Sequence, residues 1–149
     1  MEDESWIWYG WWSNVLILKM MTFTWCTGRL RVSRKVIHSE ADRIFVKEPD
    51  VILDPTGGGH PDIDRIRAAH RSDVETVLPF LLVALIWLET SPSVDSVKLV
   101  MRSFSLARIF HGLFYMDVIP VHQFVKVFTS LFSYLVAAYV AFSCVVHYA

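Results

Sequence analysis

Ionisable side chains lead directly into a long apolar run in the middle of the chain. The segment from Asp64 to Trp87 begins with charged residues and continues as VLPFLLVALIW, with no turn signal between the two parts. Such groups are costly at membrane depth and usually face a protein interior or a water-filled cavity. The pattern therefore indicates a functional site on a membrane helix. Its ionisable members are Arg65, Arg67, His70, Arg71, Asp73 and Glu75.

A second set of ionisable residues lies between Ser96 and Tyr115. Arg108, His111 and Tyr115 stand at positions i, i+3 and i+7, so a helix aligns them in one stripe. A cation, an imidazole and a phenol in one stripe could together bind an anionic ligand. Alternatively, Arg108 belongs to a buried network with an acid such as Glu75, or its side chain snorkels toward the membrane surface. The residues alone leave these alternatives open.

The composition indicates that these residues belong to a membrane protein. Of the 149 residues, 54% are hydrophobic and 19% are charged, whereas soluble domains usually contain more charged and fewer apolar residues. The formal net charge of -1 gives no support to nucleic-acid binding, which needs a basic surface. Cys26 and Cys144 lie in apolar stretches and are expected to be buried thiols without a disulfide. No metal site is predicted.

The apolar pattern predicts four helices long enough to cross a bilayer. We expect them at residues 5–35, 62–89, 95–116 and 124–148, in a single domain that comprises residues 1–149. Lys19 is the only charged residue between Ser5 and Gly28, and would snorkel or pair with an acid on another helix. The fold class is therefore an all-α membrane protein with a four-transmembrane-helix bundle. One bundle has little interior to shelter so many charges, so we expect several subunits to share it.

Basic residues are concentrated in the connection after the first predicted helix. Seven Lys or Arg lie from Arg29 to Arg65, whereas the connections at residues 89–96 and 116–123 contain none. Lys and Arg favour cytoplasmic loops in membrane proteins. We therefore expect the loop at residues 36–61 in the cytosol and both termini on the lumenal side.

The run DPTGGGHPD, from Asp54 to Asp62, has the glycines of a phosphate-binding loop but lacks the rest of that motif. No Gly-Lys-Ser/Thr follows the glycines, and no strand-turn-helix frame surrounds them. We therefore expect a flexible turn. Pro61 and Asp62 then indicate the start of the second helix.

Three stretches of the chain resemble the MAPEG family, the membrane-associated proteins in eicosanoid and glutathione metabolism. They are TGRLRVSRK after the first predicted helix, RAAHRSDVETVLPF in the second and ARIFHGLFY in the third. The resemblance implies four transmembrane helices per subunit and a homotrimer in the endoplasmic reticulum membrane. It also implies glutathione bound between subunits near the cytosolic side, and an activity of the glutathione S-transferase or prostaglandin E synthase type.

The resemblance further implies a set of site residues. Arginine forks suit the two carboxylates of glutathione, and Glu75 suits its ammonium group. Asp42 falls at the position of an acid with a proposed catalytic role in the family. By position, the residues that would line the glutathione site are Arg31, Arg71, Ser72, Glu75, Arg108, His111 and Tyr115.

Two positions depart from the family pattern. Ser72 stands where the family usually has asparagine, and keeps a hydroxyl group there. Nine residues after Tyr115 the family has an arginine, whereas this chain has Phe124. A thiol with a pKa of about 8.5 needs a nearby cation or strong donors to ionise at neutral pH. Lys126 could supply that cation, and Tyr115 could donate a hydrogen bond.

Three interpretations follow from these observations. The first is a membrane transferase or isomerase that acts on lipophilic electrophiles or lipid endoperoxides through an activated glutathione thiolate. The second is a MAPEG-like membrane protein that binds glutathione or partners without turnover, which the departure at Phe124 favours. The third is an ion or solute channel, which no filter-like sequence supports. We expect the first.

Overall fold

Four long helices account for most of the computed structural model, which describes residues 2–46 and 49–149. The all-helical fold with four long helices is therefore confirmed. The first helix begins at Glu2, earlier than expected, and each of the other three begins one residue earlier than expected. The helices are α1 (Glu2–Arg34), α2 (Pro61–Glu89), α3 (Val94–Tyr115) and α4 (Gln123–Tyr148).

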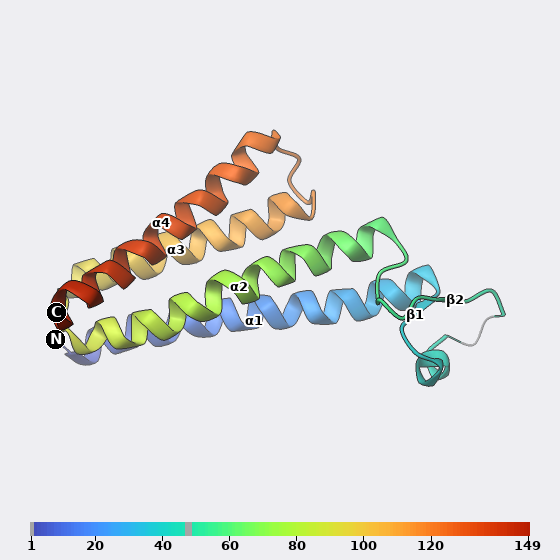
Figure 1. The fold of residues 1–149 in the computed structure, drawn as a ribbon, viewed down its shortest axis with the longest axis horizontal. Helices are drawn as coiled ribbons and strands as arrows, with labels where there is room; N and C mark the ends of the chain where they lie inside the picture. The colour runs from blue at the N-terminus through green and yellow to red at the C-terminus, as the bar shows by residue number, and fades with distance from the viewer. Residues whose placement is uncertain (1, 47–48) are drawn as a thin grey trace.

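The helices pack lengthwise in two pairs. In Figure 1, α1 and α2 run side by side along the molecule, and α3 and α4 form a second pair above them. Contacts between α1 and α3 and between α2 and α4 join the two pairs. Both termini lie at one end of the molecule, and the connection between α1 and α2 lies at the other. A site built on that connection is therefore far from the chain ends.

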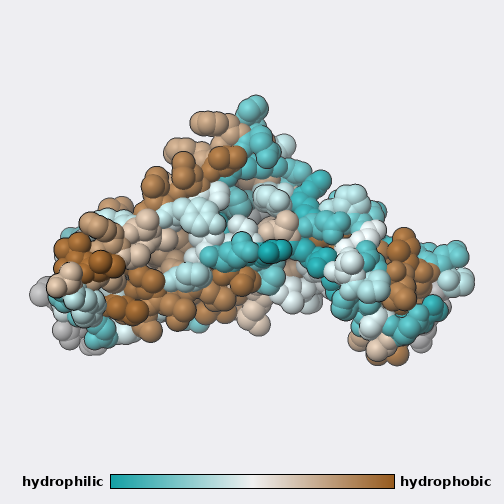
Figure 2. Space-filling view, viewed as in Figure 1, coloured by the Kyte–Doolittle hydropathy of each residue, from teal (hydrophilic) through white to brown (hydrophobic). Residues whose placement is uncertain are grey.

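The exposed surface of the helices is largely apolar. Within the described residues, α4 is the helix that is both long and apolar enough to cross a bilayer. The other three helices carry charged residues in their central turns: Lys19, Asp73 and Arg108. On the face shown in Figure 2, apolar residues gather toward the end with the termini, whereas polar residues gather toward the other end.

Local capping signals fix where the helices begin. The Pro61–Asp62 start signal lies at the beginning of α2, whose first residue is Pro61, a position where the missing N–H group has no intrahelical partner to lose. The His60 side chain accepts a hydrogen bond from the backbone N–H of Asp62 at 3.2 Å. Ser93 and His122 cap α3 and α4 in the same way. The turn residues in the sequence therefore determine the lengths of these three helices.

The connection between α1 and α2 contains short regular elements where an irregular loop was expected. Strand β1 (Val36–Ile37) pairs in parallel with strand β2 (Ile52–Leu53), and the 3₁₀ helix η1 (Glu40–Ile44) lies between them. Both residues of β1 are buried. Because β2 pairs beside the end of α1, the chain that follows it is brought back over the last turns of that helix.

The apolar core lies among the first three helices and receives one side of α4. Phe80 of α2 stacks on Phe104 of α3 with ring centroids 3.6 Å apart. Leu16 of α1 and Val140 of α4 belong to the same buried cluster. This packing holds the polar residues of neighbouring turns at fixed positions.

Candidate functional site

A buried carboxylate joins three helices at the centre of the molecule. Asp73 of α2 lies with one oxygen 2.5 Å from Nη2 of Arg108 and with the other 2.7 Å from Nζ of Lys19. Lys19 also donates a hydrogen bond to the backbone carbonyl of Arg108 at 2.6 Å. Lys19 therefore pairs with an acid on another helix, one of the two possibilities that the sequence left open. Of the alternatives for Arg108, the structure has the buried network, with Asp73 in place of Glu75.

The buried network also includes Ser72, and His111 is buried on the same helix as Arg108. Ser72 Oγ accepts a hydrogen bond from Nη2 of Arg108 at 3.2 Å. The His111 ring is buried, and its centroid lies 5.8 Å from that of the Tyr115 ring. Arg108 has no exposed surface, so its guanidinium lies in the interior and not in an open cavity.

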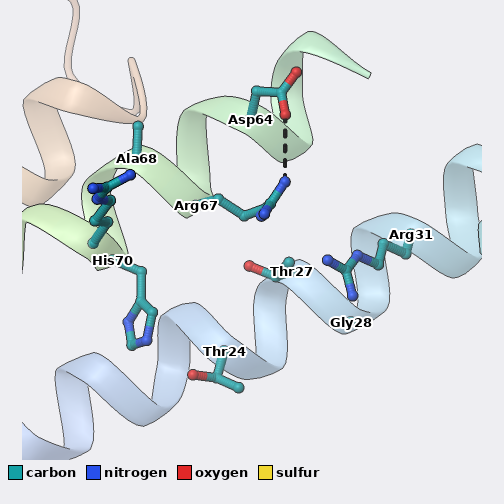
Figure 3. A pocket seen from close by; sticks show the side chains of 9 residues that line it. Thr24, Thr27, Gly28, Arg31, Asp64, Arg67, Ala68 and His70 are labelled. Atoms are coloured by element: carbon teal, nitrogen blue, oxygen red, sulfur yellow. Dashed lines mark ion pairs between the residues drawn. The ribbon is translucent and has the colours of Figure 1, made fainter. Parts of the chain in front are cut away.

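A cavity of about 750 Å³ lies between α1 and α2, near the connection that joins them. We call it the basic groove, because three arginines and a histidine in it face a single acid. Its volume falls in the range of small-molecule sites, about 300–1,000 Å³. Figure 3 shows Arg67 and His70 of α2 extending toward α1, beside Thr27 and Arg31 of that helix. The groove is lined by Thr24, Thr27, Gly28, Arg31, Asp64, Arg67, Ala68, His70 and Arg71.

Two hydrogen-bonding atoms in the basic groove are buried and unused. Arg31 donates from Nη2 to the backbone carbonyl of Gly57 at 2.9 Å. Its Nε, like Nδ1 of His70, is buried without a hydrogen-bond partner among the residues described. Buried polar atoms are normally paired. The basic groove therefore offers hydrogen-bonding capacity and positive charge to an anionic polar ligand.

The edge of the basic groove carries the i, i+4 pair that the sequence suggested. Arg71 Nε lies 2.9 Å from Oε1 of Glu75, and the Arg71 side chain is 82% exposed. Exposed pairs of this kind contribute little, about 0.3–0.5 kcal/mol. Either partner can therefore exchange its contact for a charged group on a ligand.

A second, smaller cavity of about 410 Å³ lies on the side of α2 that faces the α3–α4 connection. It contains Tyr115 and Lys126, the two residues expected to act on a thiol. Asp64 and Ala68 line this cavity and the basic groove, so the two are neighbours across one turn of α2. The other lining residues are Pro61, Arg65, Asp117 and Gln123.

An acid in the second cavity forms ion pairs with both cations that line the cavity. Asp117 lies 2.6 Å from Nζ of Lys126 and 3.1 Å from Nη1 of Arg65. The hydrogen bond from Lys126, with the charges of both cations, holds the pKa of the Asp117 carboxyl below its ordinary value. Phe124, which stands at the family's arginine position, is 71% exposed and does not line the cavity. The cations that line this cavity with Tyr115 are Arg65 and Lys126.

Asp42 lies apart from both cavities. It belongs to η1, where its carboxylate accepts hydrogen bonds from the backbone N–H groups of Ser39 and His38 at 3.1 and 3.3 Å. These bonds stabilise the first turn of η1. The structure thus groups Arg31 with Arg71, and Tyr115 with Lys126. It leaves Asp42 outside both groups.

Apart from Arg31 and Arg71, none of the residues that line the basic groove was assigned to the glutathione site from the sequence, although Arg67 and His70 belong to the ionisable segment noted there; Thr27 is a further polar member. Arg67 stands four residues before Arg71 and therefore shares its helix face. That spacing was visible in the sequence. Thr27 and His70 become groove residues only through the packing of α1 against α2, which the spacing does not give.

Comparison with known proteins identifies the family of the chain. Microsomal glutathione S-transferase 1 of Homo sapiens is 27% identical over 120 residues, which cover 80% of this chain and 77% of that protein. The same protein from Sus scrofa is 26% identical over a match of equal coverage. Prostaglandin E synthase of Homo sapiens is 26% identical over 104 residues, or 70% of this chain and 65% of that protein. The model of the MAPEG family matches residues 9–143, and the chain belongs to the MAPEG family.

Proposed function

We propose that the protein is a glutathione-dependent transferase or isomerase of the endoplasmic reticulum membrane. The basic groove carries this proposal, because its excess of positive charge and its unpaired buried donors suit a ligand with two carboxylates. The relatives named glutathione S-transferase and prostaglandin E synthase support the same ligand and a lipophilic second substrate. Lipid endoperoxides and lipophilic electrophiles are the two substrate classes.

The proposed topology places the basic groove on the cytosolic side. Four membrane-crossing helices bring both termini to the lumenal side, in agreement with their position at one end of the molecule. The connection at residues 35–60 then lies in the cytosol with the groove beside it. We further propose a homotrimer, in which neighbouring subunits cover the exposed apolar faces and share the polar interior.

The residues of the basic groove, of its edge and of the second cavity each have a role that suits their chemistry. Arg31 and Arg71 bind carboxylates, and Glu75 binds the ammonium group of glutathione. The bound tripeptide supplies a thiolate nucleophile for attack on the lipophilic substrate. Tyr115 donates a hydrogen bond to that sulfur, and Lys126 lowers the thiol pKa by its charge. A catalytic role for Asp42 remains a prediction from the resemblance.

A specific observation favours a second function, in which the protein binds glutathione without turnover. Phe124 carries no charge, and Lys126 is already paired with Asp117 at 2.6 Å. The positive potential available to a thiol is therefore smaller than an unpaired arginine would provide. A protein of this kind retains the basic groove but leaves the bound thiol protonated.

Ultraviolet difference absorbance of glutathione thiolate on the detergent-purified protein tests both functions. For the enzyme we expect a thiolate signal at neutral pH that disappears in Arg71→Ala. Arg102→Ala is the matched control, because Arg102 is an exposed arginine of α3 whose guanidinium lies over the Trp8 ring. Calorimetric binding without a thiolate signal indicates the second function. Absence of glutathione binding contradicts both.

A further inference from the structure

The glycine-rich segment after β2 forms a defined turn held by its own hydrogen bonds. We call residues 54–59 the glycine turn. Asp54 Oδ1 accepts hydrogen bonds from the backbone N–H of Thr56 at 2.9 Å and from its hydroxyl at 2.6 Å. The N–H of Gly57 donates to the carbonyl of Asp54 at 2.9 Å. A fourth local hydrogen bond runs from the Gly58 N–H to Oγ1 of Thr56 at 3.4 Å, so the turn expected here has a defined hydrogen-bonding pattern.

Gly57 of this turn lies between the guanidinium groups of two arginines. Its carbonyl accepts the hydrogen bond from Arg31. A Cβ atom at Gly57 would lie 2.8 Å from Nη2 of Arg31 and 3.6 Å from Cζ of Arg67. The residue also has a φ of 78°, a conformation that side chains other than glycine rarely adopt. The absence of a side chain therefore leaves the space in which Arg31 and Arg67 approach each other.

These two arginines have little negative charge to balance them. Arg67 comes no closer than 3.8 Å to Asp64, its acidic partner in the part of the chain that the structure describes. Arg31 has its backbone contact to Gly57 and a buried Nε without a partner in that same part. Like charges held side by side are costly unless an anion lies between them. A carboxylate that accepts hydrogen bonds from both guanidinium groups provides that anion. Charge-assisted hydrogen bonds between arginine and a carboxylate are also among the strongest in proteins.

We propose that Arg67 joins Arg31 in binding one carboxylate of glutathione, and that Gly57 is the positioning residue of this pair. The inference rests on the glutathione-binding role proposed above and adds Arg67 to it. Arg67 comes from α2 and Arg31 from α1, so the bound carboxylate bridges the two helices that form the groove. The glycine turn positions the guanidinium group of Arg31 through the hydrogen bond that Arg31 donates to the Gly57 carbonyl. That hydrogen bond thereby sets the separation between the guanidinium groups of Arg31 and Arg67.

The test measures binding of three thiol peptides to the full chain in detergent by calorimetry. They are glutathione, γ-glutamylcysteine, which lacks the glycine carboxylate, and cysteinylglycine, which lacks the γ-glutamyl group. Arg67→Gln should weaken glutathione binding about 10-fold or more, as loss of a charged hydrogen-bonding partner predicts. The peptide without the contacted carboxylate should bind Arg67→Gln and the unchanged protein equally. That selectivity identifies which carboxylate the arginines hold.

Gly57→Ala should reproduce the pattern of Arg67→Gln, including its selectivity among the three peptides. Gly10→Ala is the matched control, because a Cβ at Gly10 meets no atom within 4 Å. A Gly57→Ala protein that loses all three peptides equally contradicts the positioning role. If Arg67→Gln binds glutathione normally while Arg71→Ala does not, the inference fails and the proposed function stands. If the unchanged protein binds no glutathione, both fail.

Discussion

Arg108 of α3 and Asp73 of α2 form an ion pair that is almost completely excluded from solvent, with Nη2 and Oδ1 2.5 Å apart. Lys19 of α1 donates a hydrogen bond to the same Oδ1 at 2.9 Å and lies 2.7 Å from Oδ2. One acid thus pairs with cations from two different helices, and the cluster of three residues carries one net positive charge. The pairing fixes the rotation of three helices about their axes, and with it the faces that carry Arg31, Arg71 and Tyr115.

Replacing the shared acid should destabilise the fold strongly. Asp73→Asn leaves Lys19 and Arg108 without a counter-charge, and breaking a buried pair in this way costs about 3–5 kcal/mol. The midpoint of thermal unfolding in detergent measures the loss. Glu75→Gln, on an exposed turn of the same helix, is the control and should cost no more than about 0.5 kcal/mol. Equal midpoints for the two variants would show that the buried pair does not stabilise the fold.

Removing the counter-ion of Lys126 should favour thiolate formation. In Asp117→Asn the ammonium group of Lys126 keeps its charge and loses its anionic partner, so the pKa of a bound thiol should fall. Lys126→Met should raise that pKa, and the double variant should resemble Lys126→Met. Titration of the thiolate absorbance gives each value. A double variant that behaves like Asp117→Asn would exclude Lys126 as the activating cation.

The effect of Asp117→Asn should be nearly independent of pH above about pH 5. The pKa of Asp117 is lowered in the folded protein, so its carboxylate stays charged to a lower pH than that of a free aspartate. The difference between variant and unchanged protein should therefore vanish only as the pH falls through the lowered pKa. Affinity for S-methylglutathione, which has no thiol to titrate, measured between about pH 5 and 8 checks this constancy. A difference that declines already near neutral pH would implicate another titrating group.

Loss of the Tyr115 hydroxyl should slow turnover without disturbing the fold. Tyr115→Phe keeps the ring beside His111 but removes a donor to charged sulfur, which should lower kcat by about 10-fold or more. Steady-state kinetics with a lipophilic electrophile gives the value. Tyr134→Phe, on α4, is the matched control, since its hydroxyl makes a single 3.4 Å contact with Thr76. Similar rates for both variants would argue against hydrogen bonding from Tyr115.

An arginine at position 124 should raise activity at a small cost in stability. Phe124→Arg restores the side chain that the family pattern places there, in the first turn of α4. A cation near a helix N-terminus is unfavourable by about 0.3–1 kcal/mol. Faster turnover with a slightly lower unfolding midpoint is the expected result. Phe124→Gln supplies length without charge and should leave turnover unchanged.

The sequence predicted the four helices well because their signals are local. Capping residues, Pro61 and apolar runs act within a few residues of the helix ends that they determine. The partner of Arg108 was harder to predict, because Asp73 and Glu75 differ by about 200° in direction on a helix. Asp73 shares the buried stripe of Ala69 and Val77, four residues away on either side. That stripe identifies the inward face, which the list of ionisable residues alone does not.

The approach of the glycine turn to Arg31 could not be predicted in the same way. It depends on the parallel pairing of β1 with β2, each only two residues long. Strands so short carry no periodic pattern. The sequence argues against a phosphate-binding loop because no Gly-Lys-Ser/Thr follows the glycines. The strand-turn-helix order of β2, the glycine turn and α2 was not expected, and the contact of the turn with α1 is a tertiary feature.

The order of Lys19, Asp73 and Arg108 along the chain has a consequence for membrane insertion. In the proposed topology, α1 enters the bilayer first with a cation, and α2 follows with the acid that neutralises it. The third helix then brings a second cation, at a cost of about 2.5–3.5 kcal/mol if it is inserted alone. Because the carboxylate is already in place, nascent α3 finds its partner on a helix synthesised before it. The assembled cluster of Lys19, Asp73 and Arg108 then carries one net positive charge.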